Sequence, residues 1–317
     1  MDDSISIRAA DRGDVPRITE LLRAALGETP LLKRTPALFE WKHYDNPFGP
    51  SMILLAEKGH RLIGIRALMR WDLETAEGAT LRCLRAVDTA THPMFQGMGI
   101  FRDLTMSAIE EARDNKFDLI FNTPNEKSAP GYLKMGWRDV GWINPVVRPR
   151  IGKSIKPPTG GIPLLADAVP EAEPFVAGDY PDRPSTGLRT VRSRAYYAWR
   201  FMSHPTANFG WMADPTAGGA VVRTSIRKGR VETIISDLLA GAGEKVVRTV
   251  IGQHRTRYVA SSFTEGSPEM RALRQGGLFP IPGLKGLRLV ANPLSQFDLP
   301  VFDIASWDFA ISDLELL

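Results

Sequence analysis

The chain is poor in cysteine and histidine, and what it lacks excludes several kinds of chemistry. Cys83 is the single cysteine among 317 residues, so no disulfide can form within the chain. It lies in the apolar run TLRCLRAV, which indicates a buried strand residue rather than a nucleophile. The five histidines are scattered singly, without the Cys/His spacing of a zinc site. We therefore expect no bound metal.

Long apolar runs and clustered charge are also missing. No apolar run reaches the roughly 18 residues that a membrane-spanning helix needs. Residues 1–30 begin acidic and lack the apolar core of a signal peptide, so we expect a cytoplasmic protein without membrane contacts. The net charge of +4 comes from dispersed basic residues, whereas nucleic-acid-binding proteins usually carry a clustered basic face. No nucleic-acid partner is expected.

The first half of the chain predicts alternating strands and helices. Residues 4–9 alternate as a strand does, and a helix follows from the N-cap Asp14 to the terminating Gly27. The next elements are a helix at 35–45, strands at 51–57, 61–73 and 79–91, a helix at 100–114, a strand at 117–123, a helix at 128–135 and a strand at 137–148. This order, βααβββαβαβ, predicts a mixed α/β domain.

The second half looks like a degenerate copy of the first. YYAWRFMSHPTANFGWMAD can be aligned with LFEWKHYDNPFGPSMILLAE, which places Trp199 on Trp41. RYVASSFTEGSPEMRALRQGGL similarly aligns with DLIFNTPNEKSAPGYLKMGW, which places Gly276 on Gly136. Both tryptophans are expected in hydrophobic cores. The alternative is an unrelated α/β domain with similar landmarks.

A change of composition marks the boundary between the two halves. A length of 317 residues suits about two domains. Residues 151–186 are rich in proline and glycine, which favours a linker, with an ordered strap over the domain as the alternative. The predicted organisation is therefore a first domain at 1–150, a linker at 151–186 and a second domain at 187–317.

One glycine-containing turn carries a chemical signal. In VDTATHPMFQGMGIFRDLTMSAI, residues 87–109, a strand runs into Gln96-Gly97-Met98-Gly99, which opens directly into a helix. The first N–H groups of a helix lack intrahelical partners, and glycine lets the backbone approach an anion closely. The turn has neither the third glycine of the dinucleotide fingerprint nor the Lys of a Walker loop. It predicts a pyrophosphate site, with a plain strand-to-helix turn as the alternative.

A second segment, Asn125 to Trp137, follows the next strand, and the two segments together resemble the GNAT (GCN5-related N-acetyltransferase) superfamily. That superfamily carries Q/R-x-x-G-x-G/A at the pyrophosphate turn and N-x-x-A-x-x-L-Y-x-x-x-G-F after the next strand. The residues that match are Gln96, Gly99, Asn125, Tyr132 and Gly136. The departures are Phe101 for the final Gly/Ala, Ser128 for Ala, Gly131 for an apolar residue and Trp137 for Phe.

The resemblance implies a fold, a cofactor and a binding site. The fold would be an α/β (α+β) GNAT-like one, with a mixed, mostly antiparallel sheet flanked by helices, followed by a degenerate second GNAT-like domain as in two-domain bacterial members. The cofactor would be acetyl-CoA, the acetyl thioester of coenzyme A. The implied contacts are Thr89, Ala90 and Thr91 with the pantetheine arm, Gln96, Gly97, Met98, Gly99, Ile100 and Phe101 with the pyrophosphate, and Asn125 and Ser128 near the pantetheine.

The resemblance also implies that Tyr132 is the general acid, because a phenol can protonate a thiolate leaving group of pKa roughly 8.5. A packing role on its helix is the alternative for Tyr132. The attacking amine must lose a proton, and Asp88 or Glu126 is a candidate base. Ordinary surface or hydrogen-bonding roles are the alternative for both carboxylates, and His92 is interpreted as structural.

The implied function is an N-acetyltransferase that moves the acetyl group from acetyl-CoA to an amine, such as an amino sugar or another small amine. Two alternatives stay open: a non-catalytic acyl-CoA-binding sensor or assembly module, and a tRNA-dependent aminoacyl transferase. The second half carries Gly241 and Gly243 without a preceding Gln or Arg at the right spacing, and it lacks the Asn–Tyr pair. We therefore expect it not to bind coenzyme A. A homodimer is also left open.

Overall fold

The computed structural model divides the chain into two compact units. The described residues are 4–29, 32–150, 187–207, 209–214, 218–227, 229–239, 243–296 and 299–314. The linker expected at 151–186, and Gly241, lie outside them. The first unit contains Met1–Val140, His204–Thr206 and Leu289–Phe302, and the second contains Gly141–Ser203, Ala207–Arg288 and Asp303–Leu317.

The first unit is built on a mixed sheet with the order β1-β2-β3-β6-β7-β16-β8. Its strands are β1 (Ile5–Ala9), β2 (Met52–Lys58), β3 (Arg61–Arg70), β6 (Cys83–Thr91), β7 (Leu119–Asn122), β16 (Leu287–Pro293) and β8 (Arg138–Ile143). The strands β1, β2, β3 and β6 pair antiparallel, β6 and β7 pair parallel, and β16 is antiparallel to β7. A short hairpin of β4 (Leu73–Glu74) and β5 (Thr80–Leu81) lies between β3 and β6 in the chain. The expected mixed, mostly antiparallel sheet is confirmed.

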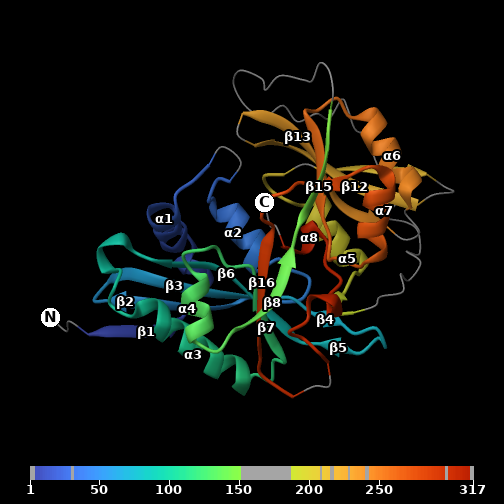
Figure 1. Ribbon diagram of the computed structural model, residues 1–317. Coiled ribbons are helices and arrows are strands. Elements are labelled where there is room, and N and C mark those ends of the chain that lie inside the picture. The colour runs from blue at the N-terminus through green and yellow to red at the C-terminus, as the bar shows by residue number, and fades with distance from the viewer. Residues whose placement is uncertain are drawn as a thin grey trace. The chain divides into compact units, whose positions relative to one another are not determined.

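Helices cover both faces of this sheet (Figure 1). The helices α3 (Ile100–Asp114) and α4 (Ala129–Lys134) share one hydrophobic core with the sheet. The opposite core contains side chains from α1 (Val15–Leu26) and α2 (Pro36–His43). The start of α2 is fixed by Thr35, whose hydroxyl accepts the Leu38 N–H as an N-cap does.

A glycine in β3 lets the start of α3 come close to the sheet. A Cβ built on Gly64 would lie 2.7 Å from Ile100 Cγ2 and 3.0 Å from Leu104 Cδ1. The first contact is too short for a real side chain and the second is tight, so a larger residue would push the helix away from β3. Because Ile100 is the first residue of α3, Gly64 sets the position of the glycine-containing turn that precedes it.

The second unit repeats most of the topology of the first. Its sheet has the order β11-β12-β13-β14-β9-β15, with β13 and β14 parallel as β6 and β7 are. The strands are β11 (Phe209–Asp214), β12 (Gly218–Arg227), β13 (Arg230–Leu239), β14 (Tyr258–Ser262), β9 (Pro145–Pro149) and β15 (Phe279–Pro280). The helix α6 (Glu244–Gln253) joins β13 to β14 as α3 joins β6 to β7, and α7 (Pro268–Gly276) follows as α4 does. The expected second copy is confirmed.

The remaining elements are short. They are η1 (Arg12–Asp14), η2 (Pro93–Phe95), β10 (Arg189–Thr190), α5 (Arg194–Tyr197), η5 (Ala198–Met202), η6 (Ile304–Ser306) and α8 (Ile311–Leu314). The pair α5 and η5 carries Trp199, as α2 carries Trp41, and both tryptophans are buried as predicted.

The hydrogen bonds after α7 correct one detail of the repeat. The N–H of Trp137 donates to the Tyr132 carbonyl after α4, and the N–H of Leu278 donates to the Leu273 carbonyl after α7. Gly136 and Gly277 then occupy the same left-handed position, with φ of 101° and 104°. Gly277 rather than Gly276 therefore corresponds to Gly136, and Leu273 corresponds to Tyr132.

The two units exchange strands, so they differ from the predicted continuous domains. The single strand expected at 137–148 is two strands, β8 in the first sheet and β9 in the second. They meet at Asn144–Pro145, where the proline has no N–H for a continuing ladder. Residues 289–302 belong to the first unit, because β16 pairs with β7 there. In the second sheet β9 takes the matching place beside β14.

Two further expectations concern Cys83 and membrane spans. Cys83 is fully buried in β6, and burial raises the pKa of its thiol, which confirms the structural interpretation. Among the described helices, none combines the length and the apolar character that crossing a bilayer requires.

Candidate functional site

The site begins at an irregularity in the strand β6. Between the pairs Ile65–Ala90 and Ala67–Val87, β3 contributes one residue and β6 contributes two, so β6 bulges. Asp88 lies in the bulge with φ of 41°, a left-handed conformation that non-glycine residues rarely adopt. The bulge directs Asp88 and Thr89 to opposite faces of the sheet, where they meet different partners.

The strands β6 and β7 separate just before the bulge. They pair through three residues, from Cys83–Leu119 to Arg85–Phe121, and β6 then continues to Thr91. Residues 86–91 therefore have β3 on one side and, within the described residues, no strand on the other. Their backbone groups form an open edge that an extended ligand can join by strand addition. Thr89, Ala90 and Thr91 lie on this edge, as the sequence analysis requires.

The turn after β6 presents backbone donors. Gly97 and Gly99 have φ of 81° and 82°, so both use the conformation that glycine adopts without strain. None of the N–H groups of residues 97–101 donates a hydrogen bond within the described part of the chain. Gln96 contributes a long contact from Nε2 to the Thr91 carbonyl, 3.5 Å away. The turn is thus suited to hold an anion.

Side chains around the turn divide into structural and exposed ones. His92 caps η2, because its Nδ1 accepts the Met94 N–H, and its Nε2 lies 2.9 Å from Arg61 Nη2. The structural interpretation of His92 is therefore confirmed. Ile100 is buried in the core, so it can offer a ligand little but its backbone, whereas Met98 is 50% exposed.

Two departures from the family pattern compensate each other. Phe101 stands where the first motif has a small residue, and Gly131 stands where the second motif has an apolar one. A Cβ on Gly131 would lie 2.9 Å from Phe101 Cε1, so the ring occupies the space that a larger residue 131 would need. The Phe101 ring then packs edge-on against Tyr132, with ring centroids 5.5 Å apart.

Gly131→Ala tests this compensation. We expect it to lower the free energy of unfolding by about 1–3 kcal/mol through overpacking, although alanine favours a helix more than glycine does. In a Phe101→Leu background the same change should cost less, as measured by urea denaturation. The control is Gly252→Ala in α6, where a Cβ would meet nothing within 4 Å, and a neutral or stabilising effect is expected there. Equal losses in both Phe101 backgrounds would contradict the compensation.

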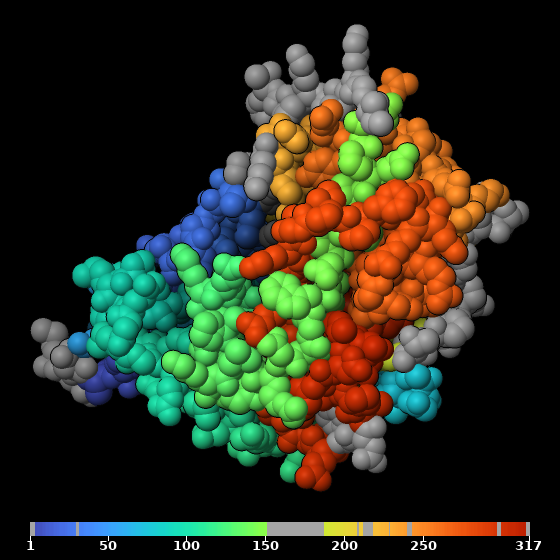
Figure 2. Space-filling view, in the orientation of Figure 1, coloured from blue at the N-terminus to red at the C-terminus, as the bar shows by residue number. Residues whose placement is uncertain are grey.

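Tyr132 lies at the centre of the site. Its side chain is only 4% exposed, and its hydroxyl accepts a 2.6 Å hydrogen bond from Arg66 Nη1. The same Nη1 atom donates to Thr89 Oγ1 on the bulge, 2.8 Å away. Arg66 thus ties the tyrosine of α4 to the bulge of β6. The green surface in Figure 2 includes α4, but the tyrosine ring itself points into the core.

Asn125 and Ser128 shape the turn before α4. Asn125 Oδ1 accepts the N–H groups of Lys127 and Ser128, both at 3.0 Å, and the Ser128 hydroxyl at 3.2 Å. The carbonyl end of the Asn125 side chain is therefore used within the turn. Its Nδ2 donates no hydrogen bond within the described residues and is available to a ligand. Glu126 is exposed on the same turn.

Asp88 lies in a cluster of cations on the opposite face. Its carboxylate is 3.4 Å from Arg34 Nη1, 2.8 Å from Lys42 Nζ and 3.0 Å from His43 Nε2, and its side chain is 9% exposed. Burial by itself would raise the pKa of Asp88, but the charge of Lys42 and the bond from His43 outweigh it, and the pKa is lowered. A carboxylate with a lowered pKa is a weak base, so this arrangement disfavours the base role considered for Asp88.

His43 serves the same cluster as a neutral donor. Complete burial lowers its pKa, although the bond to Asp88 opposes this. Its Nε2 faces the Asp88 carboxylate, which can only accept, so Nε2 carries the proton. Its Nδ1 then accepts from the Ser51 hydroxyl, 2.9 Å away. The hydrogen bonds that link Ser51, His43 and Asp88 orient the carboxylate and do not activate the Ser51 hydroxyl as a nucleophile.

The second unit holds an equivalent ion pair. The register of the paired strands can be compared between the two sheets. The same number of residues on each strand separates the pairs Leu68–Ala86 and Ile65–Ala90 in the first sheet as separates Val222–Ile235 and Gly219–Leu239 in the second. Asp237 therefore corresponds to Asp88. Arg192, two residues before α5, binds Asp237 at 2.6 Å, as Arg34, two residues before α2, binds Asp88. A feature present in both units belongs to the fold they share, which favours a structural role for Asp88.

Sequence reasoning missed the partners of Tyr132 and Asp88. Arg66 interrupts the otherwise apolar strand LIGIRALM, and a charge inside a buried strand is a signal that could have been noticed. Arg34, Lys42 and His43 gave no comparable signal, because charged residues are ordinary near helix ends. Among the described residues, no cluster of His, Cys, Asp or Glu side chains could hold a metal ion.

The sheet that opens beside a donor-rich turn, with a buried tyrosine after the next strand, has the architecture of an acyltransferase domain. Residues 6–140 match the family model described as an acetyltransferase (GNAT) domain. This match assigns the first unit to the GNAT family, and the second unit shares most of its topology. No curated protein sequence matches it significantly.

Solved structures share the fold at low sequence identity. A GCN5-related N-acetyltransferase from Anabaena variabilis is 12% identical with a TM-score of 0.61, covering 92% of this chain and 73% of that one. Eis1 from Mycobacterium abscessus is 15% identical with a TM-score of 0.59, covering 92% and 74%. A tandem GNAT protein from the clavulanic acid biosynthesis pathway is 15% identical with a TM-score of 0.53, covering 93% and 100%. Identities this low support the fold alone.

Proposed function

We propose that the first unit transfers an acetyl group from acetyl-CoA to an amine, such as an amino sugar or another small amine. Membership of the GNAT family supports acyl transfer in general. The observation that carries the proposal is the row of unpartnered N–H groups at residues 97–101, directly after the open strand edge at 86–91. An extended ligand with a pyrophosphate at one end fits both features.

The residues of the site divide the binding between them. The N–H groups from Gly97 to Phe101 would hold the pyrophosphate, helped by the positive end of the α3 dipole. The backbone of residues 89–91 would pair with the pantetheine arm. Asn125 Nδ2 would donate to an amide oxygen of the same arm, because the carbonyl end of this side chain is already used in its turn.

The chemistry then needs one proton donor and one proton acceptor. Acetyl-CoA, when bound, supplies an acyl group that is activated by its bond to sulfur. Tyr132 Oη would give its proton to the departing sulfur, and its burial keeps water from competing. Glu126, exposed on the turn before α4, is the remaining carboxylate candidate to take the proton of the amine, directly or through water.

Calorimetry and a thiol-release assay test this function. We expect one acetyl-CoA per chain, because the sequence of the second unit lacks a glycine turn preceded by Gln or Arg and lacks the Asn–Tyr pair. We also expect thiol release with some members of an amine panel. Tight binding without turnover on any amine would favour the sensor alternative. Turnover with charged tRNA in place of acetyl-CoA would favour the aminoacyl-transferase alternative. No affinity for coenzyme A or its thioesters would end the proposal.

Gly99→Val should weaken the binding of acetyl-CoA. Valine at φ of 82° is strained by about 1–3 kcal/mol, and relief of that strain would turn the N–H groups away from the anion. We expect the Kd to rise about tenfold or more. Gly59→Val is the matched control, since Gly59 has φ of 58° in the turn between β2 and β3. It should lower the Tm while leaving the Kd unchanged; an equal rise in Kd for both variants would contradict the role of the turn.

A further inference from the structure

Arg66 is a charge buried without an anion. It is 0% exposed, and its Nε and Nη2 atoms make no hydrogen bond within the described residues. No carboxylate of the described chain lies within ion-pairing distance of it, in contrast to Arg34 and Arg192. An isolated charge is costly to bury, by several kcal/mol even after relaxation of the surroundings. Such a cost calls for a compensating function.

The surroundings of Arg66 are aromatic. Its guanidinium carbon lies 5.1 Å from the ring centre of Tyr132, 5.9 Å from that of Trp137 and 6.0 Å from that of Phe101. Ring faces attract a cation, but they offset only part of the desolvation cost. Among the described residues, the guanidinium donates hydrogen bonds from Nη1 alone, to Thr89 Oγ1 and Tyr132 Oη.

The direction of the hydrogen bond to Tyr132 follows from the chemistry of arginine. A guanidinium has donors and no acceptor, so Tyr132 Oη must accept. The phenol proton therefore cannot point at Arg66. Tyr132 Oη is not seen to donate to any group in the described chain, so its proton is available to a ligand atom.

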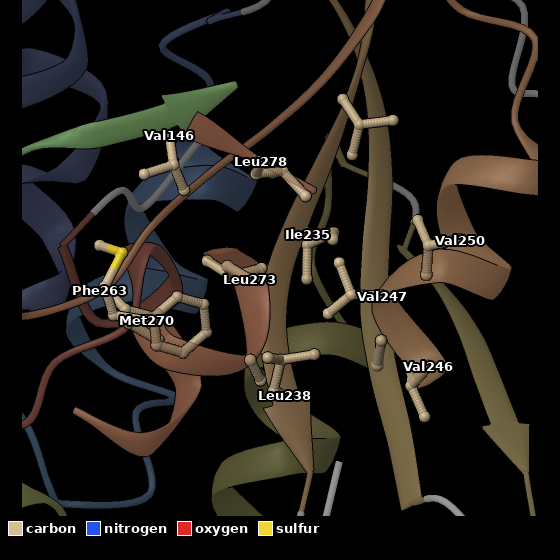
Figure 3. Close-up of a cluster of buried hydrophobic side chains, with 14 of the residues drawn as sticks. Val146, Ile235, Leu238, Val246, Val247, Val250, Phe263, Met270, Leu273 and Leu278 are labelled. Atoms are coloured by element: carbon tan, nitrogen blue, oxygen red, sulfur yellow. The ribbon is translucent and has the colours of Figure 1, made fainter. Parts of the chain in front are cut away.

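The second unit provides an internal comparison. By the register given above, Arg66 corresponds to Ala220 and Thr89 to Leu238, while Tyr132 corresponds to Leu273. All three replacements lie in one apolar core, where Figure 3 shows Leu238 and Leu273 among other aliphatic side chains. The shared fold therefore does not require Arg66. The charge is present where the acyl-transfer site is expected and absent from the unit that lacks the coenzyme turn.

We propose that Arg66 is a positioning residue that acts through Tyr132: it holds the phenol oxygen as an acceptor, aims the phenol proton at the sulfur of the thioester, and stabilises the phenolate that forms when the proton leaves. This inference rests on the proposed function. It explains why a buried cation is kept without a carboxylate, since its anion exists only during the transfer.

The step balances as follows. The amine nitrogen forms a bond to the acyl carbon, and the carbon–sulfur bond breaks with its electron pair going to sulfur. The O–H bond of Tyr132 breaks, an S–H bond forms, and the electron pair of the O–H bond stays on the phenolate beside Arg66. Glu126 takes the proton that the amine gives up, and a proton from solvent restores the phenol after coenzyme A has left.

The test is a double-mutant cycle between Arg66→Met and Tyr132→Phe, with kcat and the Kd for acetyl-CoA as readouts. We expect Arg66→Met alone to lower kcat on the order of 10²-fold, with the Kd within threefold of wild type. In the Tyr132→Phe background the same change should lower kcat less than threefold, because no phenol proton is left to aim. A purely structural role would give equal losses in both backgrounds, which would overturn the proposal.

Two further variants separate folding from function. Arg66→Lys keeps the charge and a donor, so it should retain at least a tenth of the wild-type kcat, and it remains testable if Arg66→Met does not fold. Folded Arg66→Lys protein without activity would overturn the proposal. Arg85→Met removes another buried arginine of β6, packed on Trp71, and should leave kcat of the folded protein unchanged. If wild type releases no thiol with any amine, the proposed function fails and this inference fails with it. If wild type is active but the effects of Arg66→Met and Tyr132→Phe on kcat are additive, only this inference is contradicted.

Discussion

Tyr132→Phe is expected to lower kcat by about 10²- to 10⁴-fold while changing the Kd for acetyl-CoA less than threefold. The substitution removes one hydroxyl and keeps the ring. The ring contacts with Phe101 and Trp137 therefore survive, and with them the packing of α4 on α3. Loss of kcat without loss of affinity is the signature of an interaction made in the reaction rather than in binding.

The same substitution has a small cost in stability that must be separated from catalysis. Removing the hydroxyl leaves Arg66 Nη1 with Thr89 as its remaining acceptor, so the free energy of unfolding should fall by about 1 kcal/mol. Tyr44→Phe is the control. The hydroxyl of Tyr44 is buried in the same unit without a hydrogen-bond partner, so its removal should leave kcat unchanged and should not lower stability. An unchanged kcat in Tyr132→Phe with a verified amine would show that the acid role is wrong.

Local patterns gave the sequence analysis its strongest predictions. The helix expected at 100–114 is α3 with the same bounds, because its apolar stripe and its glycine start both lie within one continuous segment. The strand expected at 117–123 contains β7, and the helix expected at 128–135 contains α4. Periodicity and turn chemistry are properties of neighbouring residues, so a single sequence is enough to find them.

Pairings between distant segments were out of reach. Nothing in residues 287–293 says that they join the first sheet beside β7, since a short apolar strand fits the free edge of either sheet. The bulge at Asp88 could not be predicted either, because it depends on how many residues β3 and β6 each place between two paired positions, and not on Asp88 itself. The proximity of Arg66 to Tyr132 depends on both the register and the packing of α4.

The internal repeat allows equivalent positions of the two units to be compared within one molecule. Residues that both units keep, such as the Arg–Asp pairs Arg34–Asp88 and Arg192–Asp237, serve the common architecture. Residues that the first unit alone has, such as Arg66 and Tyr132, are candidates for chemistry. The comparison therefore assigns different roles to two buried charged residues of the first sheet, Arg66 and Asp88, which their burial alone would not distinguish.

Asp88→Asn tests the structural side of this division. Breaking a buried ion pair leaves Lys42 and Arg34 facing a neutral group, which should cost about 3 kcal/mol and lower the Tm of the first unit on the order of 10 °C. Asparagine tolerates the left-handed φ of 41°, so the bulge itself should persist. Asp237→Asn is the matched variant and should lower the Tm of the second unit comparably, because Asp237 is fully buried and paired with an arginine.

The contribution of Asp88 to the free energy of unfolding should depend on pH. The folded-state pKa of Asp88 lies below the unfolded value of about 3.9, so its contribution to stability is present above that pH and is lost as the pH falls through the lower folded value. The stability difference between wild type and Asp88→Asn, measured by urea denaturation, should therefore be full near neutral pH and shrink below about pH 4. The kcat of folded Asp88→Asn should stay within tenfold of wild type. A 10²-fold or larger fall in kcat, with the Tm unchanged, would reverse the assignment and make Asp88 the base.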